Sequence, residues 1–137
     1  DRLYKYSVAA IEDCMVCMID SDILTDIAKS NTHYLFEMTK AVSDSGNYVY
    51  KKISDISRKQ LRGRLADSLL YLAEEIYESN EFELQLSRNE LAELSSMSME
   101  NAVRILSEFK KDGIIEVQNK YIKITDLEIL RKLSDIG

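Results

Sequence analysis

Two charged residues, Glu100 and Arg104, are spaced so that they can read the edges of DNA bases. They lie four residues apart in a stretch that we expect to be helical from Ser98 to about Asp112, so both side chains share one face. An arginine can donate to both acceptors of a guanine, and a glutamate can accept from the amino group of a cytosine. The glutamate can also hold the arginine in position. The alternative interpretation is an exposed helix with an ordinary ion pair.

The segment 86–124 that carries this pair has the pattern of a winged helix-turn-helix. Ser87 and Glu90 form a capping box that begins a first helix. The polar stretch 95–97 interrupts this helix, and Ser98 caps the second one. In such a unit the second helix enters the major groove with its N-terminal residues facing the bases. The residues predicted to read bases are Met99, Glu100, Val103 and Arg104.

A short hairpin is expected after the second helix. Gly113 is placed to end that helix in the left-handed conformation. The apolar runs IIEV and YIKI follow, and the polar residues 118–120 between them form a tolerable turn. A run that alternates at Phe82, Leu84 and Leu86 predicts one more short extended piece before the first helix.

Two further helices are expected to pack around this unit. Ser57 and Gln60 form a capping box for a helix that runs to about Tyr77. Its apolar face is predicted to contain Leu61, Leu65, Leu69, Leu72 and Ile76. A third capping box, from Thr125 and Glu128, predicts a terminal helix.

A narrow apolar seam between Tyr34 and Ile56 predicts a dimerisation helix that begins at Ser30 or Asn31. Its members recur at steps of three, four or seven residues, as in a coiled coil. Gly46 interrupts the pattern, either as a point of close approach or as a bend. The predicted dimer interface consists of Leu35, Met38, Val42, Val49, Ile53 and Ile56.

Residues 3–20 contain strand-like runs. We expect strands at roughly 3–11 and 14–19, followed by a short helix over about 22–28 capped by Ser21. Two strands are not stable alone, so they need partners from elsewhere. Asp1 leads at once into these runs, and we therefore expect a longer protein with further residues before it.

Composition narrows the functional classes. The 137 residues are 45% hydrophobic with no proline, which favours a packed, helical fold. The formal net charge of −6 disfavours DNA binding through global charge but leaves local phosphate contacts open. No catalytic set appears, so we do not expect an enzyme. There is no apolar run of about 18 residues, so a membrane span is not expected.

Cys14 and Cys17 have the spacing of a metal or redox pair, but nothing completes such a site. We expect them to be small, buried or half-buried residues in a reducing, cytoplasmic setting.

The stretch LSRNELAELSSMSMENAVRILSEFKKDGII resembles the helix-turn-helix of the Crp/Fnr family of transcription regulators. The upstream segment GRLADSLLYLA is similar to a helix of the same family, and KYIKITDLEILRKLSDIG resembles Fnr-type members more than Crp. The resemblance covers nearly the whole chain. It implies the last strands of a β-roll sensor, a short helix, a long dimerisation helix and a winged helix-turn-helix.

The resemblance also implies residue roles. Glu100 and Arg104 match the base-reading pair of the family, while Met99 and Val103 depart from its pattern. An apolar residue at such a position can contact a thymine methyl instead. The residues predicted to contact the DNA backbone are Ser87, Arg88, Asn101 and Lys120, although Ser87 can serve as a helix cap alone.

The effector cannot be assigned from these residues. In cAMP-responsive members an adjacent Thr-Ser pair reaches the nucleotide, and the matching positions here are Val49 and Tyr50, which argues against cAMP. We expect no cofactor within this chain.

The sequence therefore predicts a mainly helical fold with a small sheet. Residues 1–56 form the sensor remnant and dimerisation helix, and residues 57–137 form the winged helix-turn-helix. The predicted function is sequence-specific binding to a palindromic operator as a homodimer, with double-stranded DNA and RNA polymerase as partners. The alternative is a winged-helix module that binds proteins.

Overall fold

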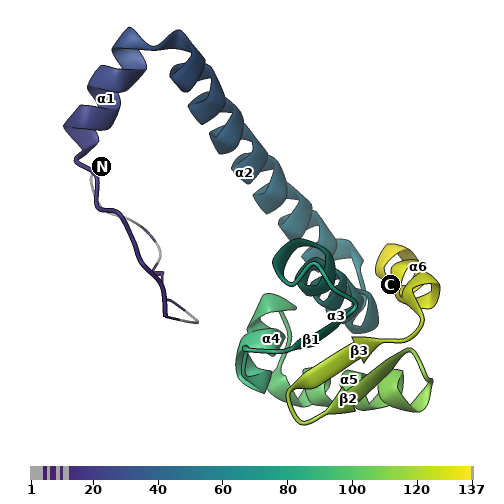
Figure 1. The fold of residues 1–137 in the computed structure, drawn as a ribbon. Coiled ribbons are helices and arrows are strands. Elements are labelled where there is room, and N and C mark those ends of the chain that lie inside the picture. Colours follow the sequence, from purple (N-terminus) through teal and green to yellow (C-terminus); the bar gives the residue numbers. More distant parts are fainter. Residues whose placement is uncertain (1–4, 6, 9, 11–12, 137) are drawn as a thin grey trace. The chain divides into compact units, whose positions relative to one another are not determined.

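The computed structural model describes residues 5, 7, 8, 10 and 13–136. The chain divides into two units, 1–53 and 54–137, and the division falls inside a long helix. Figure 1 shows the elements of each unit. The fold is mainly helical with one small sheet among the described residues, as the sequence predicts. None of the described helices is long and apolar enough to cross a membrane.

Two helices follow the N-terminal segment. Helix α1 spans Ser21–Ser30 and is capped by Asp20, whose side chain accepts a hydrogen bond from the Asp22 amide. The prediction that Ser21 is the cap is wrong by one residue, because the Asp20 carboxylate accepts from the Asp22 amide and Ser21 is already the first helical residue. Helix α2 spans Thr32–Arg58, and Asn31 caps it by accepting from the Tyr34 amide at 3.0 Å.

Helix α2 is continuous for 27 residues, about 40 Å. Gly46 neither breaks nor ends it. The predicted capping box at Ser57 is wrong, because α2 extends through this residue and its hydroxyl donates back to the Ser54 carbonyl. The next helix instead begins after Gln60, which makes no side-chain cap.

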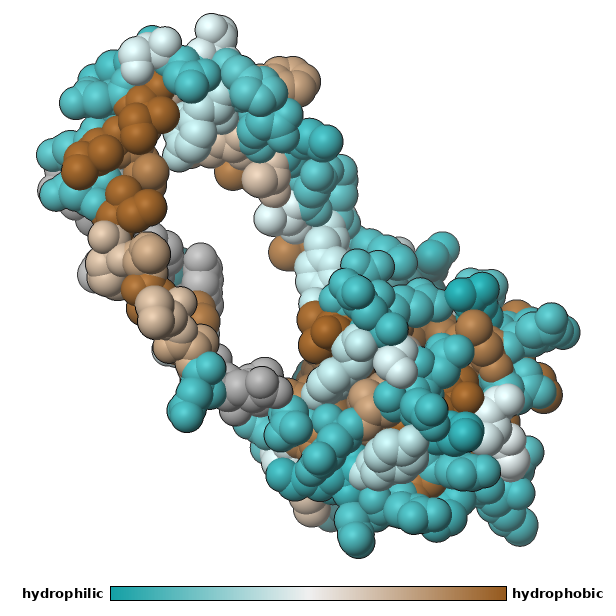
Figure 2. Space-filling view, viewed as in Figure 1, coloured by the Kyte–Doolittle hydropathy of each residue, from teal (hydrophilic) through white to brown (hydrophobic). Residues whose placement is uncertain are grey.

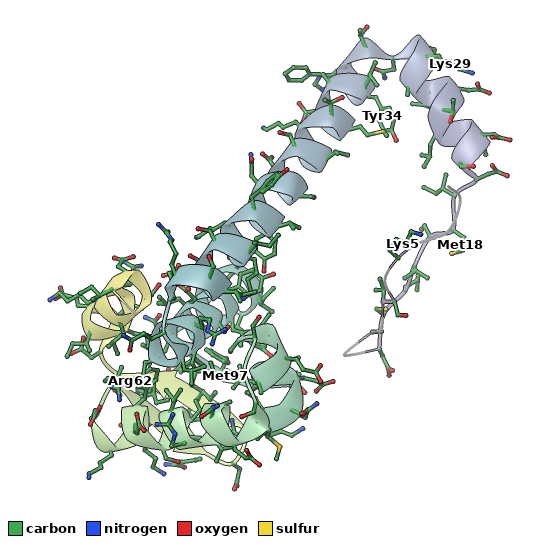
Figure 3. All side chains as sticks on the ribbon, turned by 180° about the vertical axis from the view of Figure 1, so that it is seen from behind. Lys5, Met18, Lys29, Tyr34, Arg62 and Met97 are labelled. Carbon is green, nitrogen blue, oxygen red and sulfur yellow. The ribbon has the colours of Figure 1, made fainter. Side chains whose placement is uncertain are left out.

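The predicted strand at 14–19 is wrong, because residues 13–20 have no regular structure. A strand needs a neighbouring strand to bond its backbone groups, and no described residue supplies one here. Met15 and Met18 are therefore almost fully exposed, and Figure 3 labels Met18 on this segment. Most of the predicted strand at 3–11 lies outside the described residues.

The second unit contains four α-helices, a π-helical turn and three strands packed around one core. Its elements are α3 (Leu61–Tyr71), η1 (Leu72–Ile76), β1 (Glu81–Glu83), α4 (Arg88–Leu94), α5 (Met99–Lys111), β2 (Ile115–Gln118), β3 (Tyr121–Ile124) and α6 (Leu127–Ile136). The largest fully buried apolar side chains are Phe109, Leu65, Leu69, Leu84, Leu91, Ile105, Ile115, Ile122 and Leu130.

The π-helical turn changes which residues the helix buries. The Tyr77 amide donates to the Leu72 carbonyl, five residues back, so the turn η1 is wider than an α-helical one. Leu72 stays in the core, but Ile76 rotates out and is 52% exposed. The prediction that Ile76 belongs to the buried face is therefore wrong.

The sheet has the order β1-β3-β2, and both pairs are antiparallel. Phe82 lies opposite the buried Ile122 and stacks on Tyr77 with ring centroids 4.6 Å apart. The hairpin β2–β3 and the extended piece at Phe82 confirm the predictions. Gly113 has a positive φ of 73°, as expected for the residue that ends α5.

Helix α6 closes the unit and begins one residue later than predicted. Asp126 caps it by accepting from the Ile129 amide at 2.9 Å. The predicted capping box at Thr125 is wrong, because its hydroxyl donates to the Gly113 carbonyl instead. This bond ties the end of the hairpin to the end of α5.

Candidate nucleic-acid interface

Helices α4 and α5 form a helix-turn-helix whose turn is held from α3. Ser96, in the turn, has a positive φ of 54°. The guanidinium of Arg64 donates to the Ser96 carbonyl at 2.9 Å. A residue in this conformation persists only when its surroundings hold it, so Arg64 helps to fix the path of the chain between the two helices.

Helix α5 buries one face and exposes the other. Ser98 caps its first turn by accepting from the Asn101 amide, as predicted. The buried face consists of Ala102, Ile105, Leu106 and Phe109. The exposed face carries all four residues predicted to read bases: Met99, Glu100, Val103 and Arg104. Met99 is 48% exposed and Val103 is 43% exposed, so two apolar side chains lie open among the charged ones.

Arg104 is held by residues other than the predicted Glu100. Its Nη1 donates to Glu108 Oε1 at 2.5 Å, and its Nη2 donates to Asn101 Oδ1 at 3.3 Å. Glu100 is exposed and forms no ion pair within the described chain. The expectation that Glu100 holds the arginine is wrong, because Glu108, one turn further along, occupies that place.

Glu108 is itself tied to α3. Arg62 donates to Glu108 Oε2 at 2.6 Å and to Asp112 Oδ2 at 3.1 Å. Its guanidinium also lies 5.1 Å from the centroid of the buried Phe109 ring. Sequence reasoning missed this network, since Arg62 and Glu108 are 46 residues apart.

The start of α4 carries the predicted capping box. Ser87 Oγ accepts from the Glu90 amide, and the Ser87 amide donates to Glu90 Oε2 at 2.7 Å. These hydrogen bonds from Ser87 hold the pKa of Glu90 below its usual value. The Ser87 side chain is therefore already engaged as a cap, while its predicted contact with DNA stays a prediction.

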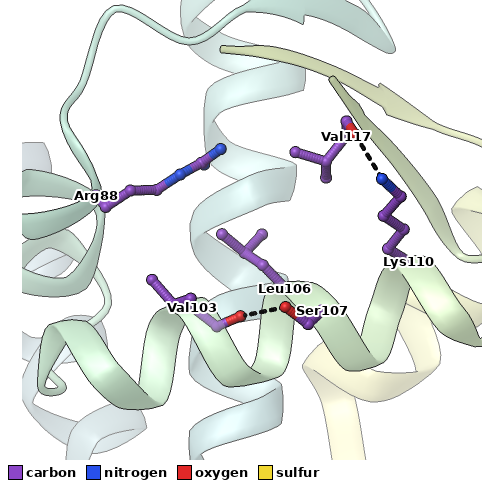
Figure 4. Close-up of a pocket in the computed structure, with 6 residues that line it drawn as sticks. All are labelled: Arg88, Val103, Leu106, Ser107, Lys110 and Val117. Carbon is purple, nitrogen blue, oxygen red and sulfur yellow. Dashed lines mark hydrogen bonds between the residues drawn. The ribbon is translucent and has the colours of Figure 1, made fainter. Parts of the chain in front are cut away.

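A pocket of about 190 Å³ lies between the start of α4, the exposed face of α5 and strand β2 (Figure 4). Arg88 points into it from one side and Lys110 stands on the other. Arg88 Nη2 donates to the Asn119 carbonyl at 2.7 Å, but its buried Nη1 has no partner. Lys110 Nζ donates to the Val117 carbonyl at 2.9 Å. Two cations thus line one pocket, and one guanidinium nitrogen there remains without an acceptor.

The two cations that line this pocket form no ion pair within the part of the chain that the structure describes. Arg88 and Lys110 each donate to a backbone carbonyl instead, whereas Lys120, in the hairpin turn, lowers the pKa of Glu90 by its charge. Other cations of the unit are paired, among them Lys59 with Asp67 at 2.7 Å. This pocket therefore presents two cations without paired carboxylates, although the whole chain carries a net charge of −6.

Polar side chains on the exposed surface also join the hairpin β2–β3 to strand β1. The Tyr121 hydroxyl donates to Glu81 Oε2 at 2.7 Å, and Lys123 lies 3.4 Å from the same oxygen. The hydrogen bond from Tyr121 is the main reason that the pKa of Glu81 is lowered, and it raises the pKa of Tyr121. Exposed polar contacts therefore fix the hairpin β2–β3, the wing, to β1 in addition to its buried apolar side chains.

The predicted dimer seam is exposed along α2. Its six residues, Leu35, Met38, Val42, Val49, Ile53 and Ile56, are between 42% and 65% exposed. On the face of α2 that Figure 2 presents, hydrophobic side chains lie among hydrophilic ones. Exposed apolar side chains that recur along one helix are typical of an interaction surface.

No set of three or more potential metal ligands occurs among the described residues. Cys14 and Cys17 are free thiols, and both are exposed rather than buried or half-buried as predicted. The reason is the missing strand, which leaves this segment without a packing surface.

Comparison with known proteins identifies the same region. A family model described as a Crp-like helix-turn-helix domain matches residues 63–133. The anaerobic regulatory protein of Haemophilus influenzae is 30% identical over 129 residues, which cover 91% of this chain and 50% of that protein. Electron transport regulator A of Shewanella oneidensis is 29% identical and is covered to 52%. The chain spans about half the length of these curated relatives.

Solved structures show the same fold. FixK2 from Bradyrhizobium japonicum superposes with a TM-score of 0.79 at 17% identity, over 84% of this chain and 59% of that one. A CooA mutant from Carboxydothermus hydrogenoformans gives a TM-score of 0.70 at 25% identity, over 84% of this chain and 55% of that one. These findings confirm the predicted fold class and the family resemblance.

Proposed function

Because this chain belongs to the Crp-like helix-turn-helix family, we propose that it regulates transcription by sequence-specific binding to double-stranded DNA. Its relatives in Haemophilus influenzae and Shewanella oneidensis are named as regulators, which supports a regulatory rather than an enzymatic role. The observation that carries the proposal is the exposed face of α5. It presents Arg104 and Glu100, which can bond guanine and cytosine, beside the apolar Met99 and Val103.

Contacts with the DNA backbone are proposed for the hairpin side of α5. Arg88 lines the pocket at the start of α4, and a guanidinium forms strong, charge-assisted hydrogen bonds with phosphate oxygens. Lys110 lines the same pocket and Lys120 lies in the hairpin turn, so both can add positive charge to the same strand of DNA. Ser87 and Asn101 complete the proposed backbone contacts.

A homodimer through α2 is the proposed oligomeric state. The exposed seam along α2 supports it, since pairing of two such helices would bury the seam. A dimer presents two copies of α5, which suits an operator with two half-sites about one helical turn apart. RNA polymerase is proposed as a further partner on family membership alone. We also propose an effector other than cAMP, because Val49 and Tyr50 on α2 stand where cAMP-responsive members have their Thr-Ser pair.

Binding-site selection from a random duplex library tests the assignment of roles. The wild-type chain, Arg104→Ala and Arg88→Ala are compared at one salt concentration. We expect Arg104→Ala to lose the preference for one guanine in each half-site, a loss of about 1–3 kcal/mol of discrimination. We expect Arg88→Ala to weaken binding to all sequences alike, because a phosphate contact carries no sequence information.

An unchanged half-site preference in Arg104→Ala would contradict the role given to this residue. If the wild type selects no sequence at all, the alternative of a protein-binding winged helix gains support. The acidic net charge of −6 is the observation that favours this alternative.

A further inference from the structure

The contact between Glu108 and Arg104 gives the base-reading arginine a fixed partner. We propose that Glu108 is a positioning residue that sets the sequence specificity of Arg104. This inference rests on the proposed function in DNA binding. It concerns a residue outside the exposed stretch that was expected to read bases, and it is carried by distances within the second unit.

Both terminal nitrogens of the Arg104 guanidinium form hydrogen bonds within α5. Nη1 donates to Glu108 and Nη2 donates to Asn101, so the plane of the guanidinium is fixed along α5. Reading a guanine requires two N–H groups to meet two acceptors at once. A side chain that is already oriented loses less rotational freedom when it forms this pair of bonds.

Glu108 cannot easily turn away from Arg104, because Arg62 holds its other oxygen. The Arg62 guanidinium donates to Glu108 Oε2 at 2.6 Å and packs over the Phe109 ring. Because this ring is fully buried, the Arg62 guanidinium packs directly against the core of the unit. The carboxylate of Glu108 thus bridges a fixed cation on α3 and the reading cation on α5.

The contacts of Glu108 with Arg62 and Arg104 affect DNA binding more than they affect the stability of the fold. The side chains of Arg104 and Glu108 are 57% and 33% exposed, and ion pairs at such sites contribute little to stability. On DNA the same pair acts differently. The carboxylate offsets the charge of Arg104, so a nearby phosphate attracts it less. Hydrogen bonds to a correctly placed guanine still form, because they depend on orientation. Glu108 therefore favours the correct base over arbitrary sequence.

The test is a comparison of Glu108→Gln with Asp112→Asn in the full chain. Both changes remove one carboxylate that contacts Arg62, but Asp112 does not reach Arg104. The probes are a fluorescent duplex with the half-sites selected by the wild type and the same duplex with the key guanine pair replaced. Fluorescence anisotropy gives both dissociation constants at several salt concentrations.

We expect Glu108→Gln to bind the altered duplex more tightly and to reduce the ratio of the two dissociation constants by about threefold to tenfold, which is part of the discrimination of one arginine–guanine contact. The salt slope on the altered duplex should steepen by about 0.9 for each phosphate newly contacted. Asp112→Asn should leave the ratio at its wild-type value. In an Arg104→Ala background, Glu108→Gln should no longer change the ratio.

A ratio unchanged by Glu108→Gln, while the wild type binds with sequence preference, overturns this inference and leaves the proposed function intact. A changed ratio that persists in the Arg104→Ala background also overturns it, since Glu108 would then act through another residue. Failure of the wild type to bind any duplex overturns the proposed function and this inference together. Thermal unfolding followed by circular dichroism shows whether each variant keeps the wild-type fold.

Discussion

The caps of α4 and α5 differ in one carboxylate, and this difference has a measurable consequence. Ser87 and Glu90 cap α4 by two reciprocal hydrogen bonds. Ser98 caps α5 alone, with Asn101 at the position that Glu90 holds in α4. Only the first cap therefore contains a group that titrates. Its stabilising effect must depend on pH, whereas that of the second must not.

Ser87→Ala is expected to destabilise the chain by about 1 kcal/mol at neutral pH, as is typical for the loss of an N-cap. The pKa of folded Glu90 is lowered by its bonds to Ser87. The stabilisation is therefore present above the unfolded pKa and is lost as pH falls through the folded pKa. Alanine keeps the amide that donates to Glu90 but lacks the hydroxyl, which is the larger cause of the lowered pKa. The difference between wild type and Ser87→Ala should therefore shrink in acid by the share that the hydroxyl contributes.

Urea unfolding at neutral and acidic pH measures this difference, and Ser98→Ala is the matched control. The cost of Ser98→Ala should stay constant over the same pH range. If the two variants respond to acid in the same way, the carboxylate does not contribute as inferred.

Local patterns predicted some helix ends but placed others wrongly, as at Ser57 and Thr125, and contacts between distant elements could not be predicted. The caps at Ser87 and Ser98 and the left-handed Gly113 depend on neighbours within four residues, so the sequence pattern contains them. The partner of Arg104 was predicted as Glu100, although Glu108 has the same spacing of four residues in the other direction. Arg62 decides between them by holding Glu108, and no local pattern reveals this contact.

At the scale of elements, α2 raises the clearest question because it exposes an apolar seam. The helix is one continuous element of 27 residues with no buried residue among those described. An amphipathic helix gains most of its stability by burying its apolar face. A second copy of the chain offers a matching seam.

Replacing both Val49 and Ile53 by Asp should convert a dimer into monomers, because pairing would bury carboxylates against an apolar seam. Sedimentation velocity at tens of micromolar protein measures the change. Lys51→Asp, which adds a carboxylate beside the seam, should remain dimeric. A well-folded monomer for the unaltered chain under these conditions would contradict the proposed dimer.

Among the strands, those with a partner in the chain formed as predicted, and the one without a partner did not. The hairpin β2–β3 brings two strands together through a short turn, so its prediction was confirmed. The strand predicted at 14–19 had no such partner and did not form. Ile76 illustrates a third case, since the π-helical turn η1 shifts the buried face in a way that a period of 3.6 residues cannot anticipate.

At the scale of the whole molecule, DNA binding depends more on where the charged residues lie than on the net charge of the chain. The net charge is −6, yet several carboxylates are offset by ion pairs within the second unit, such as Glu74 with Arg131 at 2.8 Å. The cations Arg88 and Lys110 form no ion pair within the described chain and donate only to backbone carbonyls beside α5. An acidic protein can therefore present a local positive edge to DNA.

The salt dependence of duplex binding tests most directly whether α4, α5 and the wing bind DNA through contacts with its phosphates. The logarithm of the association constant for the selected duplex should fall linearly with the logarithm of salt concentration, by about 0.9 for each phosphate that the protein neutralises. Lys110→Ala and Lys120→Ala should each make this slope shallower by about 0.9, because each removes a cation that neutralises one phosphate. An affinity that does not change with salt, or no binding to any duplex by the folded dimer, would contradict the proposal that α4, α5 and the wing bind DNA.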